Sequence, residues 1–131
     1  AKDRSENIRR LAEVATHLAR NGHIAIVAAV SPSTEDRAAA RRIAGDLFRE
    51  IYIATPAEVC ESRDPKGHYA KARAGNLSGF TGIGNDYETP HASELVIDTS
   101  RRAIVEAVGD ITRMLSRTGV LPDTVAALAA S

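Results

Sequence analysis

The sequence lacks the features of several common classes of protein. Its 17 basic and 17 acidic side chains balance to a net charge of zero, so no bulk field holds it on nucleic acid or an anionic membrane. A single cysteine, Cys60, cannot form an internal disulfide, which predicts a reducing, cytoplasmic compartment. No apolar run approaches the roughly 20 residues that span a bilayer, and the opening AKDRSENIRR lacks the apolar core of a signal peptide. We therefore expect a cytoplasmic protein that binds neither nucleic acid nor membrane.

Familiar catalytic and metal-binding motifs are also absent. The sequence contains no GxSxG, GxGxxG or GxxxxGK(S/T) motif. The histidines show neither HxxxH spacing nor pairing with cysteine, so we expect no structural metal site. Asp86 and Glu88 lie close together in a turn-rich stretch, and we interpret them as a solvated pair rather than an acid–base dyad.

Helix and strand patterns alternate along the chain, which indicates a single domain over residues 1–131. Amphipathic spacing predicts helices over 3–21, 33–47, 56–62 and 103–117. Runs of β-branched residues predict buried strands over 23–30, 50–54 and 95–98. Ser33 with Asp36 resembles a capping box, and Thr55 before Pro56 predicts a capping hydroxyl. The tail beyond Pro122 is expected to be a loosely held helix or a frayed end.

This order of elements predicts an α/β fold in which right-handed crossovers connect the strands of a parallel sheet. Ligands of such sheets bind outside the carboxyl ends of the strands. Ser31, Thr55 and Thr99 each follow a predicted strand. We therefore expect all three at the ligand-binding edge.

The stretch RDPKGHYAKARAGNLSGFTGI, residues 63–83, is unlike the rest of the chain. Basic side chains, Arg63 and Lys66 among them, stand between glycines and one aromatic residue, Phe80. Glycines let a backbone swing and approach a ligand closely, and cations meet an anion when such a segment closes. The stretch is therefore a candidate lid over a phosphorylated ligand, and a solvated surface loop is the alternative.

Several segments together resemble the adenylylsulfate kinases. They are DRSENIRR at 3–10, VSP at 30–32, PAEVCESRDPKGHYAKARAG at 56–75 and GFTGI at 79–83. They occur in the family's order with nearly its spacing, and the similarity runs from Asp3 to about Pro122. The resemblance implies a three-layer P-loop kinase fold with a parallel sheet. It also implies that magnesium-ATP phosphorylates the 3′-hydroxyl of adenosine 5′-phosphosulfate, called adenylylsulfate below.

The resemblance further implies roles for individual residues. Substrate-binding roles fall on Arg4, Asn7, Val30, Ser31, Lys66, Gly79 and Phe80. Lys66 and Ser31 are also catalytic candidates, Ser31 because some family members carry a phosphoserine at the matching position, although a turn residue explains it equally well. Phe80 would offer an aromatic face to the adenine. Arg63 is a candidate ATP contact by analogy with other nucleotide kinases.

The sequence also departs from the family. The family begins with a strand and a GxxxxGK(S/T) phosphate loop, followed by a second strand that ends in DGDN, and none of these precedes Asp3 here. Those parts cradle the ATP phosphates and supply a magnesium ligand. We therefore expect the sequence to be a portion of a longer kinase, and this portion does not include the module that binds the ATP phosphates. A rearranged remnant stabilised by a partner is the alternative.

Two functions of different class stay open. The first is an adenylylsulfate kinase that produces 3′-phosphoadenylylsulfate and ADP, either free-standing or fused to a sulfate adenylyltransferase; relatives are commonly homodimers. The second is a non-catalytic module that binds adenylylsulfate or docks onto a sulfate adenylyltransferase subunit. A nucleic-acid binder that uses the basic residues of the lid fits less well, because the net charge is zero and the lid has one stacking aromatic.

Overall fold

The computed structural model describes residues 2–64, 66–74 and 87–122. They divide between two compact units. The helical unit consists of Ala1–Arg49 and Gly67–His91, and the sheet unit of Glu50–Lys66 and Ala92–Ser131. The tail beyond Pro122 and most of the predicted lid, Gly79 and Phe80 included, lie outside the described residues.

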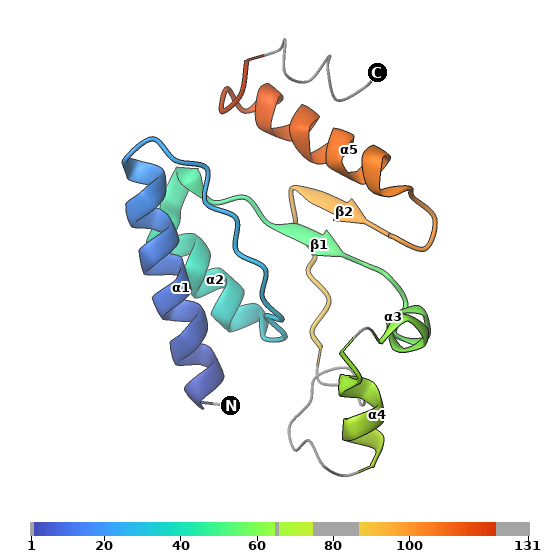
Figure 1. Ribbon diagram of the computed structural model, residues 1–131. Helices are drawn as coiled ribbons and strands as arrows, with labels where there is room; N and C mark the ends of the chain where they lie inside the picture. The colour runs from blue at the N-terminus through green and yellow to red at the C-terminus, as the bar shows by residue number, and fades with distance from the viewer. Residues whose placement is uncertain (1, 65, 75–86, 123–131) are drawn as a thin grey trace. The chain divides into compact units, whose positions relative to one another are not determined.

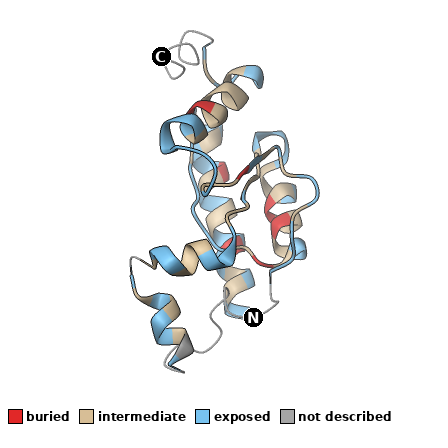
Figure 2. Ribbon diagram, turned by 90° about the vertical axis from the view of Figure 1, so that its right-hand side faces the viewer, coloured by how far each residue is buried: buried red, intermediate tan, exposed pale blue. Residues whose placement is uncertain are grey.

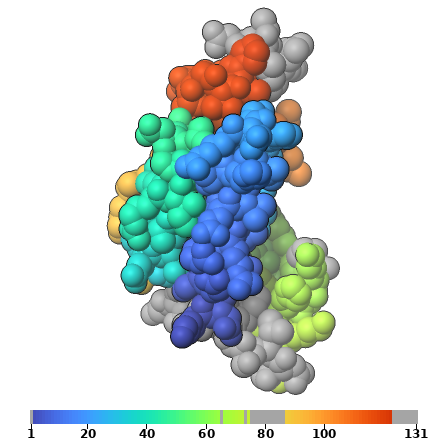
Figure 3. All heavy atoms as spheres, turned by 90° about the vertical axis from the view of Figure 1, so that its left-hand side faces the viewer, coloured from blue at the N-terminus to red at the C-terminus, as the bar shows by residue number. Residues whose placement is uncertain are grey.

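Two amphipathic helices, α1 (Lys2–Arg20) and α2 (Thr34–Ala44), pack side by side in the helical unit (Figures 1 and 3). Ile8 and Ala40 are buried on these helices, as the apolar spacing requires. Helix α1 ends at a turn in which Gly22 has a φ of 84°, a left-handed conformation that glycine adopts without strain. Both helices confirm the sequence prediction, except that the last turn, Gly45–Leu47, is a 3₁₀ helix called η1.

The start of α2 is capped as expected, but only in part. The hydroxyl of Ser33 accepts a hydrogen bond from the amide of Asp36 at 3.4 Å. The carboxylate of Asp36 accepts a hydrogen bond from the hydroxyl of Ser5 on α1, at 3.0 Å. Asp36 thus ties the first turn of α1 to the first turn of α2.

The predicted buried strand over residues 23–30 is wrong. These residues have no regular secondary structure, and the side chain of Ile26 is 89% exposed. A strand needs a neighbour to pair its backbone groups, and the pairing that the structure shows joins β1 to β2. Apolar, β-branched composition is therefore not enough to form a strand here.

The sheet unit contains a parallel pair, β1 (Ile51–Ile53) with β2 (Leu95–Ile97). Both strands and their parallel pairing confirm the prediction. Helix α5 (Ile104–Arg117) packs on β2, whose Ile97 is 3% exposed. Among the described residues, the buried ones lie on α1, α2, β2 and α5 and at Pro32, just before α2 (Figure 2).

Two short helices complete the described chain, α3 (Ala57–Arg63) in the sheet unit and α4 (His68–Arg73) in the helical unit. Helix α3 confirms the predicted short helix, but the predicted cap is wrong because Pro56 occupies the cap position. The hydroxyl of Thr55 bonds to Thr99 instead. Helix α4 was not expected, and it makes part of the predicted lid helical.

Candidate functional site

The carboxyl ends of β1 and β2 carry a pair of threonine hydroxyls. Oγ1 of Thr55 and Oγ1 of Thr99 share a hydrogen bond of 2.7 Å. The amide of Thr99 also donates to Oγ1 of Thr55 at 3.0 Å. The two strands run parallel, so their carboxyl ends meet at one edge, and the prediction that Thr55 and Thr99 lie together there is confirmed.

Arg63, the last residue of α3, reaches this threonine pair. Its Nη1 donates to Oγ1 of Thr99 at 2.8 Å, and its Nη2 donates to the Thr99 carbonyl at 3.0 Å. Its side chain is nevertheless exposed. A guanidinium beside hydroxyls at a sheet edge is suited to a polar, anionic ligand.

Asp98 adds a negative charge next to this edge. The hydroxyl and amide of Ser100 donate to its carboxylate at 2.6 and 2.8 Å. These bonds, with smaller contributions from the charges of Arg101 and Arg63, hold the pKa of Asp98 below its usual range. Asp98 is therefore ionised at neutral pH and helps to keep Arg63 near the edge.

In the helical unit, the predicted substrate residues lie on the start of α1 and just before α2. Arg4 and Asn7 are one turn apart on α1, so they share one side of the helix. Ser31 is half-buried, while Val30 is 61% exposed. The bond between Ser5 and Asp36 brings the two groups to the same end of the helix pair.

Arg37 on α2 holds Ser31 in place. It is 8% exposed, and its Nη1 donates to the Ser31 carbonyl at 2.5 Å. Its Nη2 donates to Oγ1 of Thr34 at 3.1 Å and to the Glu88 carbonyl at 2.6 Å. The ring of Tyr87 lies beneath the guanidinium, 5.5 Å from its carbon to the ring centre.

Glu88 makes two further bonds to the segment that precedes and begins α2. Its amide donates to the Pro32 carbonyl at 2.9 Å, and its carboxylate accepts from the Thr34 amide at 2.6 Å. The bonds from Thr34, then the charge of Arg37, lower the pKa of Glu88. Glu88 thus caps α2, a more specific role than the solvated pair expected from its sequence. We call Ser31, Thr34, Arg37, Tyr87 and Glu88 the Arg37 cluster.

The remaining predicted site residues are Lys66, Gly79 and Phe80. Lys66 is exposed and belongs to the sheet unit, while Ser31 belongs to the helical unit. That Ser31 meets the two threonines at one edge, or that Lys66 meets Ser31 in one pocket, stays a prediction. Gly79 and Phe80 lie outside the described residues.

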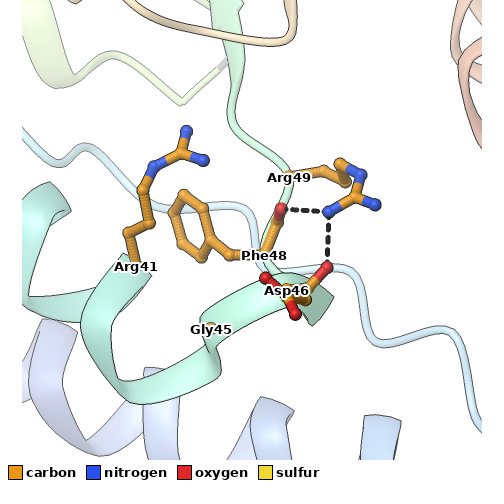
Figure 4. A pocket seen from close by; sticks show the side chains of 5 residues that line it. All are labelled: Arg41, Gly45, Asp46, Phe48 and Arg49. Atoms are coloured by element: carbon orange, nitrogen blue, oxygen red, sulfur yellow. Dashed lines mark hydrogen bonds between the residues drawn. The ribbon is translucent and has the colours of Figure 1, made fainter. Parts of the chain in front are cut away.

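A hollow of about 540 Å³ at the end of α2 involves none of the predicted site residues (Figure 4). Its arginines are already engaged: Arg41 lies 4.7 Å over the ring of Phe48, and Nη1 of Arg49 donates to the carbonyls of Asp46 and Phe48. These contacts close the end of the helix and need no ligand. The hollow is therefore structural.

Over residues 2–64, 66–74 and 87–122 there is no group of three or more acidic, histidine or cysteine side chains placed to hold a metal ion. In those same ranges, no helix has the length and hydropathy to cross a membrane.

Arg37 and Glu88 were missed as site residues from the sequence. The available signal was the position of Arg37 on the same face of α2 as the buried Ala40. A charged residue within an apolar stripe must find polar partners when it is buried. Nothing near it in sequence points to Tyr87 and Glu88 as the partners.

A parallel strand pair with a helix packed on it defines, together with the packed helix pair, an α/β protein, a class in which ligands generally bind outside the carboxyl ends of the strands. A family model described as adenylylsulphate kinase matches residues 1–98. The chain belongs to the adenylylsulphate kinase family. Adenylyl-sulfate kinase of Paraburkholderia xenovorans is 46% identical over 107 residues, which are 82% of this chain and 60% of that protein. The enzyme of Shewanella sp. (strain ANA-3) is 43% identical over 129 residues, 97% of this chain and 63% of that protein.

A solved structure gives the same result for the fold. The Mycobacterium tuberculosis APS kinase, in complex with AMPPNP and APS, superimposes with a TM-score of 0.84 and 44% identity. The match covers 88% of this chain and 68% of that chain. The predicted α/β, P-loop kinase fold is thereby confirmed. The chain spans about 60% of the length of the curated relatives it matches.

Proposed function

We propose that this protein is an adenylylsulfate kinase, which transfers the γ-phosphoryl group of ATP to the 3′-hydroxyl of adenylylsulfate. The observation that carries the proposal is the 44% identity, at a TM-score of 0.84, to a kinase solved with both APS and an ATP analogue. Identity at this level, spread over 88% of the chain, supports a shared substrate as well as a shared fold.

The helical unit supplies most of the proposed acceptor site. Arg4 offers a cation and Asn7 an amide on one side of α1, and both suit the oxygens of a phosphosulfate and a ribose. Val30 and Ser31 would line the pocket, with the Ser31 backbone held by Arg37. The resemblance adds Lys66, Gly79 and Phe80 to this pocket.

The sheet unit supplies the proposed nucleotide contact. Arg63 is exposed, and its guanidinium donates to the hydroxyl and to the carbonyl of Thr99. A guanidinium in this setting can bind phosphate oxygens in a bidentate manner or stack on a base. Its fit to ATP supports the assignment of Arg63 to the nucleotide.

Magnesium is the expected companion of ATP, and the described residues hold no group of three or more candidate metal ligands. Magnesium commonly keeps several waters and takes one or two carboxylates plus substrate phosphates. We assign no ligand for it among these residues.

The reaction forms a bond from the 3′-oxygen of adenylylsulfate to the γ-phosphorus and breaks the bond from that phosphorus to the bridging oxygen. ADP departs with the bridging oxygen and the electron pair of the broken bond, and the proton of the 3′-hydroxyl passes to solvent. Phosphoryl transfer depends mainly on positioning and on charge stabilisation. Arg4 and Ser31 would fix the acceptor, while Lys66 would neutralise negative charge on it. Phosphorylation of Ser31 is a separate proposal, which the resemblance to the family supports.

A coupled assay of ADP release tests the function. The full-length protein is incubated with magnesium-ATP and adenylylsulfate, and the product is identified by mass spectrometry. We expect ADP and 3′-phosphoadenylylsulfate in equal amounts, and no ADP with the 3′-deoxy analogue of adenylylsulfate. Binding of adenylylsulfate without ADP release would contradict the kinase and favour the non-catalytic module.

Two further features complete the proposal. A cytoplasmic location is supported by the single cysteine, which allows no internal disulfide. We also propose a homodimer, because relatives in the family are commonly dimers. A sulfate adenylyltransferase, as a fused domain or a separate subunit, is proposed on the same ground. Size-exclusion chromatography with light scattering tests the dimer.

A further inference from the structure

A buried arginine that no proposed catalytic step uses stands out in the helical unit. Arg37 is 8% exposed, whereas its neighbour Arg42 on the same helix is exposed. Burying a guanidinium is costly unless its donors are satisfied. The contacts that satisfy Arg37 therefore indicate what the residue is for.

Those contacts join two segments that are far apart in sequence. One guanidinium nitrogen bonds to the carbonyl of Ser31, and another bonds to the carbonyl of Glu88. Separate bonds run directly between the segments, from the Glu88 amide to the Pro32 carbonyl and from the Thr34 amide to the Glu88 carboxylate. Arg37 thus lies at the centre of a small hydrogen-bonded junction.

The chemistry of the junction requires an arginine. Its two bonded carbonyls belong to different segments, and a planar guanidinium presents donors toward both at once. A lysine has one nitrogen on a flexible stem and cannot reproduce this fork. The ring of Tyr87 fixes the plane of the guanidinium from one face.

We propose that Arg37 is a positioning residue for the acceptor site: it fixes the backbone of Ser31 against Glu88 and so sets the affinity for adenylylsulfate. The inference rests on the proposed function, because Ser31 belongs to the proposed adenylylsulfate pocket. Arg37 acts through Ser31 and does not itself touch the substrate. Its loss should therefore affect adenylylsulfate and leave ATP largely unaffected.

The first part of the test needs no substrate. Amide hydrogen exchange of the full-length protein is compared for wild type, Arg37→Lys, Arg37→Met and the exposed control Arg42→Met. We expect the amides of Thr34 and Glu88 to exchange at least about tenfold faster in both Arg37 variants. Exchange as slow as in wild type would overturn the junction itself, whatever the protein's function.

The second part measures binding. Calorimetric titration of the same proteins should show the Kd for adenylylsulfate raised about tenfold in Arg37→Lys and Arg37→Met, with the Kd for AMPPNP within about twofold of wild type. Arg42→Met should leave both values unchanged. Equal weakening of both ligands, or wild-type affinity in Arg37→Lys, would overturn the positioning role.

Two milder variants keep the test decisive if Arg37→Met does not fold. Tyr87→Leu removes the ring face beneath the guanidinium, and Thr34→Ala removes one acceptor of Arg37. Each should weaken adenylylsulfate binding by about threefold and leave AMPPNP binding unchanged. No effect of either variant would overturn the proposal. If wild type binds no adenylylsulfate, the proposed function fails while the exchange data still judge the junction.

Discussion

Two arginines of this chain each hydrogen-bond to a residue next to a regular element, but they differ in burial. Arg37 bonds to Ser31, just before α2, and Arg63 bonds to Thr99, just after β2. Arg37 is buried and bonds to carbonyls of two separate segments. Arg63 is exposed, and its guanidinium donates to the hydroxyl and the carbonyl of a single residue, Thr99. Water can replace Thr99 as the partner of Arg63, but it cannot reach the Arg37 junction as easily. A buried arginine therefore serves the architecture, and an exposed one stays available to a ligand.

The largest expected effect separates the two arginines by stability. Arg37→Met should lower the free energy of unfolding by about 2 kcal/mol, because it leaves the carbonyls of Ser31 and Glu88 without their guanidinium donor. Arg63→Met should change it by less than about 0.5 kcal/mol, because its carbonyl partner can bond to water. Urea unfolding of the full-length protein, with Arg42→Met as control, measures both. Equal losses would remove the distinction between the two arginines.

Lys66 sharpens the comparison, because it belongs to the same unit as Arg63 but is assigned to the other ligand. Lys66→Ala should raise the Kd for adenylylsulfate about tenfold, since the cation proposed to bind the anionic substrate is lost. The Kd for AMPPNP should stay within about twofold of wild type. Calorimetry with Lys71→Ala as the matched control checks this, and equal loss of both ligands would reject the assignment.

The threonine pair beneath Arg63 should matter less. Thr55→Val removes the acceptor of the Thr99 amide and should cost about 1 kcal/mol of stability. Thr55→Ser retains the hydroxyl and should restore most of it. Hydrogen exchange of the Thr99 amide reports directly, because it should be fast in Thr55→Val and slow in Thr55→Ser. Slow exchange in both would show that the hydroxyl pair does not hold the strand ends together.

The smallest effect is a dependence on pH at the Arg37 cluster. The pKa of Glu88 is lowered from its ordinary value of 4.5, so its ionised form stabilises the folded chain above that value. This contribution is lost as the pH falls through the lowered pKa. Melting temperatures of wild type and Glu88→Gln should therefore differ at about pH 6, and the difference should shrink as the pH falls below the ordinary pKa of 4.5. A difference that stays constant over this range would contradict the assigned cause; Glu35→Gln is the control.

Local patterns predicted much of the fold. The apolar spacing of α1, α2 and α5 and the β-branched residues of β1 and β2 all placed their elements within a few residues. The meeting of Thr55 and Thr99 also followed, because parallel strands end at one edge. These results depend on residues that are near one another in sequence or on a general rule of sheet geometry.

Predictions failed where a distant partner decides the outcome. Residues 23–30 and 95–98 are similarly apolar and β-branched, but only the second segment lies beside another described strand. The sequence offered the hydroxyl of Thr55 a nearby partner, the start of α3. In the structure this hydroxyl bonds instead to Thr99, which is distant in sequence. The composition of a segment indicates which secondary structure it favours, but it does not identify the strand or side chain with which the segment will pair.

The Arg37 cluster shows the same limit at the candidate site. An arginine in a helix is usually solvated, and Arg37 is buried because Tyr87 and Glu88 cover it from a distant part of the chain. The family resemblance identified Ser31 through a matching motif but gave no reason for its position. The contacts of Arg37 supply that reason.

We expect the two arginines to affect different ligands: Arg37 affects adenylylsulfate through Ser31, and Arg63 affects ATP. The most direct measurement is calorimetric titration of Arg37→Lys and Arg63→Lys, in the full-length protein, with adenylylsulfate and with AMPPNP. The account predicts a crossed pattern, in which Arg37→Lys weakens adenylylsulfate alone and Arg63→Lys weakens AMPPNP alone, each by about tenfold. If each variant weakens both ligands to the same extent, the division between an acceptor side and a nucleotide side is wrong.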